Sequence, residues 1–375
     1  MIRVLTFGRF ADESFGGLER YVFELGHALE GEVHLVNIVA HRGAPPDVPM
    51  AGETVYARPL ASLGGTPVCP TMPWHALRRH WRQPFDIVHL QFPADPMAHL
   101  AYELMPRSVK RVIGWHSDIV RQQNLLKLYR PFLNHSLRAA DAIIAATPAH
   151  ISSSVQLSPV RETANFRVVP YGFDLSRFEQ RPVLADEIRR RYDGKFLVFA
   201  LGRHVYYKGF EFLIRALASL PGAALALGGQ GPLTPELERI AREAGVAERV
   251  HFVGRIADKD LPAWYHACDA FCLPSVEPAE AFGIVQVEAM ACGKPVVCCQ
   301  LDNGVNWVNL DGETGFAVAP ADPAALAGAL ARLQQDATLR ARLGQAGHRR
   351  ALAYFTSAAM AKSTLAVYRE VLSRL

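Results

Sequence analysis

Short hydrophobic runs alternate with amphipathic stretches along the whole chain. In the first half, runs rich in valine, isoleucine and aromatic residues predict β-strands, and hydrophobic positions at helical spacing predict helices between them. The predicted strands cover residues 2–8, 32–40, 86–92, 110–116, 141–147 and 166–172, and the clearest helices cover 16–29, 121–138 and 148–157. Regular alternation of this kind is typical of a parallel, doubly wound sheet covered by helices.

A second series with the same alternation follows. Its predicted strands cover residues 196–202, 223–229, 249–254, 270–275 and 294–300, with helices between them at 208–219, 233–245 and 258–267. The chain then ends in helices predicted at 322–334, 336–353 and 356–374. We therefore predict an α/β fold of two Rossmann-like, doubly wound parallel-sheet domains facing a central cleft. In such sheets ligands bind at the carboxyl ends of the strands.

A polar segment marked by proline and glycine separates the two series. We predict that residues 173–182 form a linker between an N-terminal domain of residues 1–172 and a second domain of residues 183–355. The length supports this division, because 375 residues exceed what one hydrophobic core usually serves. The remaining residues, 356–375, form the last predicted helix.

Composition and charge narrow the class of protein. Half of the residues are hydrophobic and a fifth are charged, as in an ordinary soluble enzyme, and the net charge of +4 is too small to indicate nucleic-acid binding. The six cysteines lack disulfide or metal-site spacing, so we expect reduced thiols in the cores. No signal peptide and no apolar run near the ~20 residues of a membrane span is evident. We therefore expect a cytoplasmic protein.

Glycine-rich loops follow two of the predicted strands. Gly16 and Gly17 open the first helix, and Gly229 and Gly231 lie in a second loop of sequence GGQGP. Glycines let backbone N–H groups approach an anionic ligand closely, and a helix start favours negative charge. The spacing is not that of a dinucleotide fingerprint. Ordinary turns are the simpler interpretation of each loop alone.

Two basic residues follow the first strand of the second half. Arg203 and Lys208 are predicted at its carboxyl end, where an arginine fork and a lysine charge would neutralise a diphosphate leaving group without a metal ion. A solvated loop is the alternative interpretation. Further along, the backbone around Arg255 and Ile256 ends a predicted strand and is placed to pair with the edge of a base.

Two glutamates, Glu280 and Glu288, lie eight residues apart around a Phe-Gly-Ile sequence. Pro278 and Gly283 predict that a helix begins near Gly283, which places Glu280 on the preceding loop and Glu288 within the helix. Glu288 would then accept hydrogen bonds from ribose hydroxyls. Glu280 would accept them from a sugar, which the amides of 282–284 (Phe282, Gly283 and Ile284) would also bind.

The first half contributes His116 and Asp118, which follow a predicted strand within the sequence WHSD. Both are predicted to face the cleft, with Asp118 on the acceptor side; a structural histidine is the alternative. The DKD sequence at 258–260 is similar to a metal-binding motif, but helix capping explains its position better. We predict no metal site and no cofactor.

Together these features resemble a retaining glycosyltransferase of the GT-B fold, family 4. The resemblance covers nearly the whole chain, and its specific part is the Glu280–Glu288 stretch with Arg203 and Lys208. It implies that Arg203 and Lys208 hold the diphosphate of a nucleotide-sugar donor and that Glu288 binds the ribose. It also implies that the last helix crosses back onto the first domain.

The same resemblance implies contacts with the transferred sugar. These are assigned to Glu280, His116 and the backbone of 282–284, while Gly16 and Gly17 approach the β-phosphate. The spellings WHSDIV and EAFGIVQVEAMA are most similar to bacterial mannosyltransferases that use GDP-mannose in polysaccharide or lipopolysaccharide assembly. His204 and the sequence VEPAEAFG depart from the commonest family spelling.

Several alternatives remain at this stage. A UDP-sugar donor fits the same fold, and a sugar-nucleotide epimerase, a sugar phosphorylase or a non-catalytic nucleotide-sugar-binding scaffold are rivals of other classes. The acceptor is expected to be a saccharide or a lipid-linked saccharide. Basic and apolar residues mix at 75–83 and 121–138, which predicts either peripheral contact with an anionic membrane surface or ordinary solvated helix faces.

Overall fold

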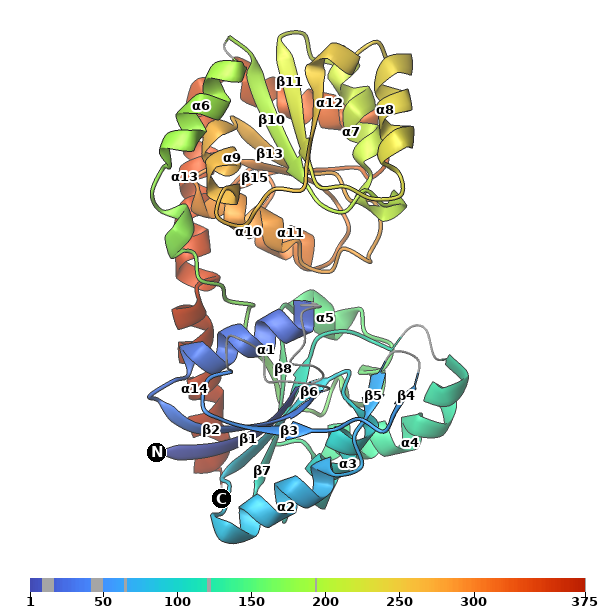
Figure 1. Cartoon of the computed structure of the whole chain (residues 1–375), viewed down its shortest axis with the longest axis vertical. Helices are drawn as coiled ribbons and strands as arrows, with labels where there is room; N and C mark the ends of the chain where they lie inside the picture. The colour runs from blue at the N-terminus through green and yellow to red at the C-terminus, as the bar shows by residue number, and fades with distance from the viewer. Residues whose placement is uncertain (9–16, 42–49, 64–65, 120–122, 193, 375) are drawn as a thin grey trace. The chain divides into compact units, whose positions relative to one another are not determined.

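The computed structural model describes residues 1–8, 17–41, 50–63, 66–119, 123–192 and 194–374. The chain divides into two compact units (Figure 1). The first unit contains Met1–Phe173 and Thr356–Leu375, and the second contains Asp174–Phe355. The last helix of the chain is therefore part of the first unit.

The first unit is built on a seven-stranded parallel sheet with the strand order β3-β2-β1-β6-β7-β8-β9. These strands are β1 (Ile2–Gly8), β2 (Val33–Ala40), β3 (Glu53–Ala57), β6 (Ile87–Phe92), β7 (Lys110–Trp115), β8 (Ala142–Ala145) and β9 (Phe166–Val168). The order of the strands reverses between β1 and β6, which marks the switch point of a doubly wound sheet. A separate antiparallel pair consists of β4 (Ala61–Leu63) and β5 (Thr66–Val68).

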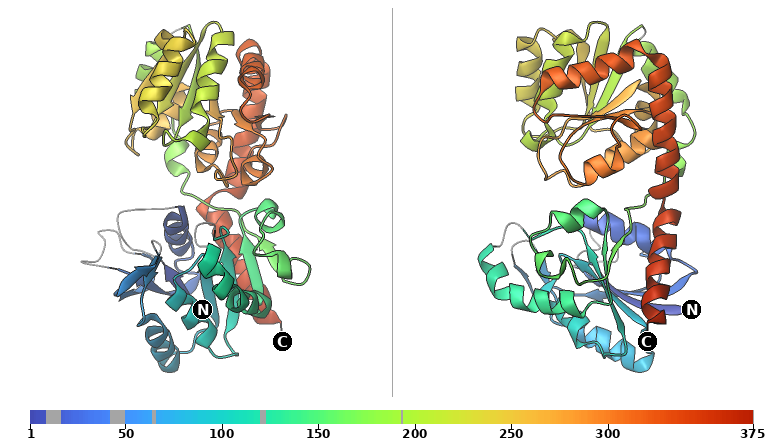
Figure 2. Two further views of the ribbon diagram at one scale, coloured as in Figure 1. Left: turned by 90° about the vertical axis from the view of Figure 1, so that its right-hand side faces the viewer. Right: turned by 180° about the vertical axis from the view of Figure 1, so that it is seen from behind.

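Helices cover both faces of this sheet. Residues of α2 (Met72–Arg82), α3 (Pro96–Leu104) and α4 (Gln123–Ala139) share one hydrophobic cluster with one face. Residues of α1 (Gly17–Ala28) and α14 (Ser357–Ser373) share another with the opposite face, as Figures 1 and 2 show. The remaining short helices of the unit are α5 (Pro148–Ser152) and the 3-10 turn η1 (Ser158–Val160).

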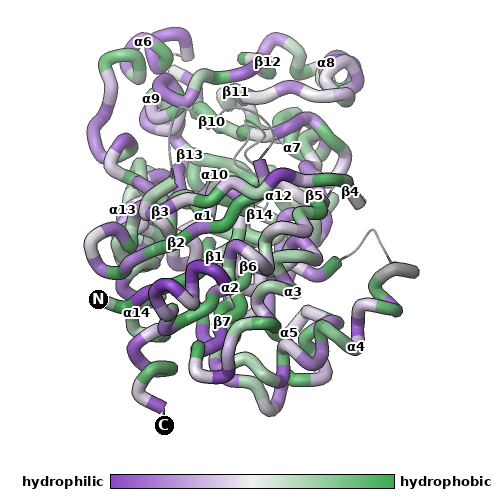
Figure 3. The backbone as a smooth tube through the Cα atoms, turned by 60° about the horizontal axis from the view of Figure 1, so that its bottom comes forward, coloured by the Kyte–Doolittle hydropathy of each residue, from purple (hydrophilic) through white to green (hydrophobic). Residues whose placement is uncertain are grey.

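The second unit repeats this plan with six parallel strands in the order β12-β11-β10-β13-β14-β15. They are β10 (Phe196–Leu201), β11 (Ala223–Gly228), β12 (Val250–Gly254), β13 (Ala270–Leu273), β14 (Val296–Cys299) and β15 (Gly315–Val318). The order reverses between β10 and β13. The strands of both units are predominantly hydrophobic, as the tube in Figure 3 shows, because helices bury both faces of each sheet.

The helices of the second unit also pack on both sides of the sheet. They are α6 (Val183–Arg191), α7 (Phe210–Ala216), α8 (Thr234–Glu243), α9 (Leu261–Ala267), α10 (Ile284–Ala291), α11 (Gly304–Val308), α12 (Pro323–Gln335) and α13 (Ala337–Tyr354). Single 3-10 turns lie at Ser176–Phe178, Tyr206–Lys208, Leu217–Ser219 and Ala247–Arg249. Residues of α7, α8 and α12 share one hydrophobic cluster with β10 and β11, and aromatic stacking joins α9 to β10 on the other face.

The predicted pair of doubly wound parallel-sheet domains is confirmed, with differences at the edges. The hydrophobic pattern does not predict β3, because this edge strand is only half-buried and carries polar residues. The helix predicted at 208–219 begins only at Phe210, since Gly209 adopts a left-handed conformation before it. All six cysteines are buried thiols, as predicted. Among the described helices, none combines the length and the apolarity that a bilayer span requires.

Candidate functional site

The predicted site residues of the second unit cluster on loops at its switch point. Arg203 and Lys208 follow β10, and Glu280 lies on the loop between β13 and α10. Because β10 and β13 are parallel neighbours, their carboxyl ends lie at one edge of the sheet. Ligands of doubly wound sheets bind at this position.

Lys208 and Glu280 form an ion pair between these two loops. Each side chain is only 12% exposed. The ammonium group of Lys208 donates to Oε2 of Glu280, and the hydroxyl of Ser275 donates to the same oxygen at 3.1 Å. The side-chain amide of Asn303 donates to the Glu280 carbonyl at 2.7 Å. Within the described residues, Oε1 of Glu280 has no hydrogen-bond partner, so this oxygen is available to a ligand hydroxyl.

Gly209 allows the two loops to come together. Its φ of 63° lies in the left-handed region, and a Cβ atom there would be 2.1 Å from the carbonyl oxygen of Pro274. The loops are also joined by a backbone hydrogen bond of 2.9 Å from Val276 to the carbonyl of Tyr207. The Lys208–Glu280 pair therefore depends on a glycine at position 209.

The Arg203 side chain is exposed and makes no hydrogen bond or ion pair with any described residue, although the backbone carbonyl accepts a 2.9 Å hydrogen bond from the Val205 N–H. The side chain of Lys208 lies against Gly202, the residue before Arg203, because a Cβ atom on Gly202 would be 3.3 Å from Cε of Lys208. The Lys208 side chain thus lies beside the residue that precedes Arg203; Lys208 is paired with Glu280, and the Arg203 side chain is available. The arrangement fits a ligand that carries several negative charges.

The structure gives Gly229 and Gly231 a packing role. A Cβ on Gly229, whose φ is 100°, would be 2.0 Å from the carbonyl oxygen of Gly202. A Cβ on Gly231 would be 2.5 Å from the carbonyl oxygen of His204. Close packing of the loops after β10 and β11 therefore explains both glycines without a ligand. The predicted approach of their amides to a phosphate stays a prediction.

Glu288 lies inside α10 and is almost buried, with 5% of its side chain exposed. Its Oε2 accepts a hydrogen bond of 2.8 Å from the Tyr265 hydroxyl, and its Oε1 lies 3.4 Å from the Arg177 guanidinium. Burial, together with the adjacent Glu288, raises the pKa of Tyr265 well above its usual value, so this hydroxyl remains a donor. Ribose hydroxyls would have to use the second lone pairs of the carboxylate oxygens.

The backbone of 282–284 leads into α10 as predicted. Gly283 occupies the N-cap position with φ 70°, and the helix begins at Ile284, so the first-turn N–H groups lie at the end of the Glu280 loop. The Phe282 side chain is buried and packs edge-on against Phe355. The Phe282 side chain is therefore not placed to bind a ligand.

Arg255 and Ile256 border a concavity of about 190 Å³ next to α6 and α9. Arg255 is exposed, and Asp260 and Trp264 also line the concavity. Asp260 occupies the N-cap position of α9, as the sequence predicts, although its side chain makes no capping hydrogen bond. In the parts of the chain that the structure describes, no group of three or more histidine, cysteine and carboxylate side chains is arranged to hold a metal ion.

His116 follows β7 in the first unit, where two side chains hold its ring. Nε2 lies 2.8 Å from Oε1 of Gln91, and Nδ1 lies 3.0 Å from the Tyr171 hydroxyl. The amide oxygen can only accept, so Nε2 carries the proton and Nδ1 accepts from Tyr171. Burial, with smaller contributions from His89 and His150, lowers the pKa of His116 to about 3. The ring is therefore a neutral imidazole in a fixed orientation.

Asp118 fastens a neighbouring loop. Its Oδ1 accepts from the Ser154 hydroxyl at 2.5 Å, and its Oδ2 accepts from the backbone N–H groups of Val155 and Gln156 at 3.0 and 3.3 Å. These bonds give Asp118 a structural role, and the predicted acceptor-side role stays a prediction. Gly16 lies outside the described residues, and Gly17 is the first residue of α1.

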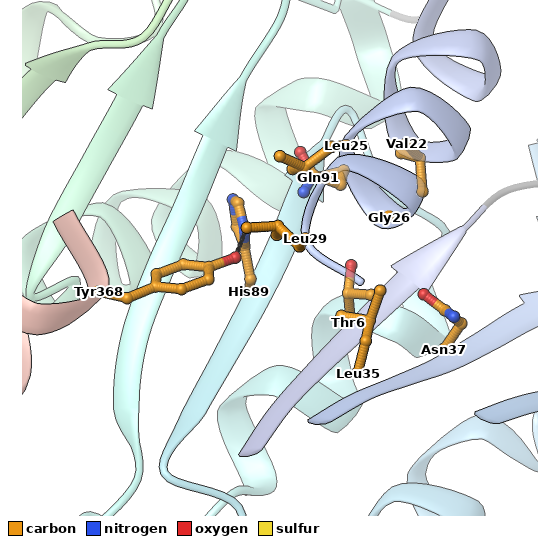
Figure 4. A pocket seen from close by; sticks show the side chains of 10 residues that line it. All are labelled: Thr6, Val22, Leu25, Gly26, Leu29, Leu35, Asn37, His89, Gln91 and Tyr368. Atoms are coloured by element: carbon orange, nitrogen blue, oxygen red, sulfur yellow. Dashed lines mark hydrogen bonds between the residues drawn. The ribbon is translucent and has the colours of Figure 1, made fainter. Parts of the chain in front are cut away.

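A small pocket in the first unit is lined by residues of β1, β2, β6, α1 and α14 (Figure 4). Its volume is about 10 Å³, which is room for roughly one water molecule and far too little for a sugar. Three buried polar atoms facing it, Thr6 Oγ1, Asn37 Oδ1 and His89 Nε2, have no hydrogen-bond partner among the described residues. This pocket is not a substrate site.

The sequence patterns did not predict the residues that orient the predicted site residues His116 and Glu280. Gln91 orients His116, while Ser275 and Asn303 hold Glu280. Gln91 and Ser275 lie at or just past the carboxyl ends of predicted strands, which is a usable signal. The contact of Asn303 with Glu280 spans 23 residues, and no local pattern predicts it.

Comparison with known proteins shows similarity over both units. Residues 185–350 match the family described as glycosyl transferases group 1, and residues 15–177 match the family described as glycosyltransferase family 4. The D-rhamnosyltransferase WbpZ of Pseudomonas aeruginosa is 32% identical over 95% of this chain and 93% of its own length. The O-antigen chain mannosyltransferase C of Escherichia coli is 27% identical over 99% of both chains.

A third relative is the GDP-mannose-dependent alpha-(1-6)-phosphatidylinositol monomannoside mannosyltransferase of Mycobacterium tuberculosis, 27% identical over 92% of this chain and 93% of that protein. Among solved structures, sucrose-phosphate synthase from Thermosynechococcus elongatus is 24% identical, covers 100% of both chains and has a TM-score of 0.75. Anabaena HepE in complex with UDP is 21% identical, with a TM-score of 0.77 over 98% of this chain and 100% of that one. Both structures show the same fold.

Proposed function

This chain belongs to glycosyltransferase family 4 of the GT-B fold, and we propose that it transfers mannose from GDP-mannose with retention of configuration. The proposed acceptor is a saccharide or lipid-linked saccharide used in cell-surface polysaccharide or lipopolysaccharide synthesis. That the protein is a hexosyltransferase follows from the family; the donor, the stereochemistry and the acceptor are the proposed part. Two full-length relatives support it, because one is named as an O-antigen chain mannosyltransferase and the other as a GDP-mannose-dependent mannosyltransferase, whereas a third is named as a D-rhamnosyltransferase.

The main structural support for the proposal is the hydrogen bonding of the Glu280 carboxylate. One oxygen of its carboxylate is held by Lys208 and Ser275, and the other has no partner within the described residues. A carboxylate oriented in this way is an acceptor for a sugar hydroxyl, and the adjacent lysine is a donor for a phosphate. The pair thus suits the junction of a sugar and a diphosphate.

Departure of the diphosphate builds negative charge at this junction. In the proposed mechanism, the glycosidic C–O bond to the diphosphate breaks and the diphosphate leaves with the electron pair. The acceptor hydroxyl forms the new bond on the same face of the sugar, and its proton passes to the departing diphosphate. Lys208 and the exposed Arg203 stabilise the leaving charge, so the proposal requires no metal ion. Glu288, the backbone of 282–284 and the neutral His116 are proposed to bind the ribose and the transferred sugar.

A UDP-sugar is the second candidate donor. The HepE structure of the same fold was determined with UDP, and the proposed base contacts through the backbone at Arg255 and Ile256 do not by themselves select guanine. The rest of the proposed site is common to both donors. The experiment therefore has to distinguish a GDP-sugar donor from a UDP-sugar donor.

A turnover assay tests the proposal. The purified protein is incubated separately with GDP-mannose, UDP-glucose and UDP-galactose, and the released nucleoside diphosphate is measured with and without a lipid-linked saccharide acceptor. We expect release from GDP-mannose, reduced by about 100-fold or more in Lys208→Gln and unchanged in Lys362→Gln, which removes an exposed lysine of α14. Turnover of only a UDP-sugar would replace the donor, and no turnover of any sugar nucleotide would refute the proposal.

A further inference from the structure

The second unit begins with a turn that contacts Glu288. This turn, η2 (Ser176–Phe178), lies directly after the start of the unit at Asp174. Within it, the guanidinium of Arg177 lies 3.4 Å from Oε1 of Glu288 on α10. The Glu288 side chain is 5% exposed and that of Arg177 is 32% exposed. Since buried charges in proteins are paired, Arg177 supplies a cation for this carboxylate.

Packing fixes the Arg177 side chain beside this carboxylate. Its guanidinium lies over the Phe178 ring, 4.6 Å from the ring centroid. That ring is buried and packs edge-on against Tyr265 of α9 at 5.8 Å. The Phe178 carbonyl accepts a 2.9 Å hydrogen bond from Nε2 of His266, which also lies on α9. The position of Arg177 is therefore set by contacts of its turn with α9 as well as by its attraction to Glu288.

Tyr265 holds the other oxygen of the same carboxylate. Its hydroxyl donates to Oε2 of Glu288 at 2.8 Å, and its ring is fully buried against Phe199 and Phe271. A carboxylate with a donor on each oxygen cannot turn about its last bond without losing one of these donors. Carboxylate oxygens have two lone pairs each, so these two bonds leave acceptor capacity for a ligand hydroxyl. Arg177 and Tyr265 together thus fix the plane in which Glu288 accepts further hydrogen bonds.

We propose that Arg177 is a positioning residue for the ribose of the donor nucleotide. It holds the Glu288 carboxylate in the orientation in which both ribose hydroxyls can donate to it, and it thereby makes the site selective for ribonucleotides. The inference rests on the proposed function, in which Glu288 binds the ribose. Two neighbouring hydroxyls on one ring fix two hydrogen-bond directions, and a carboxylate that is already oriented matches them without a further loss of rotational freedom.

A purely structural ion pair would have a different effect on ligand binding. Loss of such a pair would loosen η2 and α10 and would weaken the binding of every nucleotide in the same proportion. A positioning role predicts a selective loss, confined to nucleotides that carry both ribose hydroxyls. The comparison of a ribonucleotide with its 2′-deoxy form therefore separates the two roles, because the two ligands differ in one hydroxyl and share the base and the diphosphate.

Calorimetric titration of the full chain with such pairs of nucleotides tests the inference. GDP is compared with 2′-deoxy-GDP and UDP with 2′-deoxy-UDP, so the outcome does not depend on which base the site prefers. We expect the unaltered protein to bind the ribonucleotide of its preferred pair about tenfold or more tightly than the deoxy form, because a hydrogen bond to a charged group is lost. In Arg177→Met this ratio is expected to fall to about threefold or less.

Further variants define the contribution of Arg177. Arg177→Lys keeps the charge without the planar fork, and it is expected to retain more of the preference for the ribonucleotide than Arg177→Met. Tyr265→Phe removes the donor to the other carboxylate oxygen and is expected to lower the same ratio. The matched control is Arg181→Met, which removes an exposed arginine that contacts Asp186 and the His266 carbonyl, and it should leave the ratio unchanged.

Two results would overturn this inference alone. One is a ratio in Arg177→Met equal to that of the unaltered protein, and the other is equal binding of the ribonucleotide and its deoxy form by the unaltered protein. Both leave nucleotide binding intact, so the proposed transfer reaction would stand. If neither GDP nor UDP binds, the proposed function fails and this inference fails with it. Circular dichroism shows whether each variant is folded; if Arg177→Met is not, Arg177→Lys and Tyr265→Phe provide the same test.

Discussion

At the scale of single residues, Glu280 has one carboxylate oxygen that is held in place and one that is available to a ligand. Lys208 and Ser275 hold one of its oxygens, Asn303 holds its backbone carbonyl, and its other oxygen has no described partner. A long side chain that is fixed in this way loses little further freedom when a sugar hydroxyl binds. The site is thus organised before the donor arrives, and the contribution of Glu280 can be tested apart from nucleotide binding.

Glu280→Gln is expected to lower sugar transfer by about 100-fold while changing the affinity for the nucleoside diphosphate by less than about threefold. The amide keeps the shape of the side chain but loses the charge that orients Lys208 and accepts the sugar hydroxyl. Steady-state transfer and calorimetric titration of the same preparation measure the two quantities. The control is Glu277→Gln in the same loop, which should leave transfer unchanged; equal transfer by both variants would contradict the role of Glu280.

The residues that carry charge could be predicted from the sequence, whereas most of their partners could not. Lys208 and Glu280 stand in loops after clear hydrophobic strands, so the fold class alone places them near one another. One partner of Glu288 is Arg177, 111 residues earlier, and one partner of His116 is Tyr171, 55 residues later. Such contacts depend on how strands and loops pack in three dimensions, so the spacing of residues in the sequence does not predict them.

At the scale of elements, the site depends on the contact between the loops after β10 and β13. Gly209 ends the turn that carries Lys208 and packs directly on the Pro274 carbonyl. A side chain at this position would push the two loops apart. The hydrophobic pattern predicts both strands but does not reveal this contact.

Gly209→Ala is therefore expected to weaken diphosphate binding by about tenfold or more and to destabilise the protein by more than the ~1 kcal/mol of a left-handed alanine alone. Gly245→Ala separates the two effects, because Gly245 also has a positive φ of 68° but has nothing within 4 Å of its Cβ position. Urea unfolding and calorimetric titration of the two variants provide the comparison. Equal losses of stability and of diphosphate affinity in the two variants would contradict the role of the loop contact.

Helix α14 completes the core of the first unit although it lies at the far end of the sequence. Tyr368 is fully buried, and its hydroxyl forms a 2.8 Å hydrogen bond with Nδ1 of His89 on β6 (Figure 4). Tyr368→Phe is expected to cost about 1–2 kcal/mol through the lost hydrogen bond, and Tyr368→Ala about 3–5 kcal/mol through the cavity. Equilibrium unfolding in urea measures both costs, and similar small values for the two variants would contradict this role of the helix.

At the scale of the whole molecule, buried histidines make stability depend on pH. Burial lowers the pKa values of His89 and His99 to about 3, below the usual value of 6.5. The folded protein thus binds fewer protons than the unfolded chain between these values, so stability is highest above pH 6.5 and falls as the pH is lowered. At pH 5.5 these two histidines are each expected to remove about 1.4 kcal/mol relative to high pH, or about 3 kcal/mol together, and His116, whose pKa is also lowered to about 3, adds to this loss.

Urea unfolding between pH 8 and pH 5 measures this loss, and NMR titration of the histidine ring protons identifies its source. The signals of His89 and His99 should not titrate in the folded protein above about pH 4. Native-state titration of either ring near pH 6.5 would contradict the expectation. The NMR signals of these two rings report on the core and not on the proposed site, since both rings are buried in the first unit.

The central claim is that the second unit binds a nucleoside diphosphate through Lys208 without a metal ion, and calorimetric titration with GDP, UDP and ADP tests it most directly. The account predicts that GDP binds at least tenfold more tightly than the others, a difference of about 1.4 kcal/mol. It also predicts that EDTA has no effect and that Lys208→Gln weakens binding by about tenfold or more. Absence of nucleotide binding, or binding that needs a metal ion or is indifferent to Lys208, would contradict the claim.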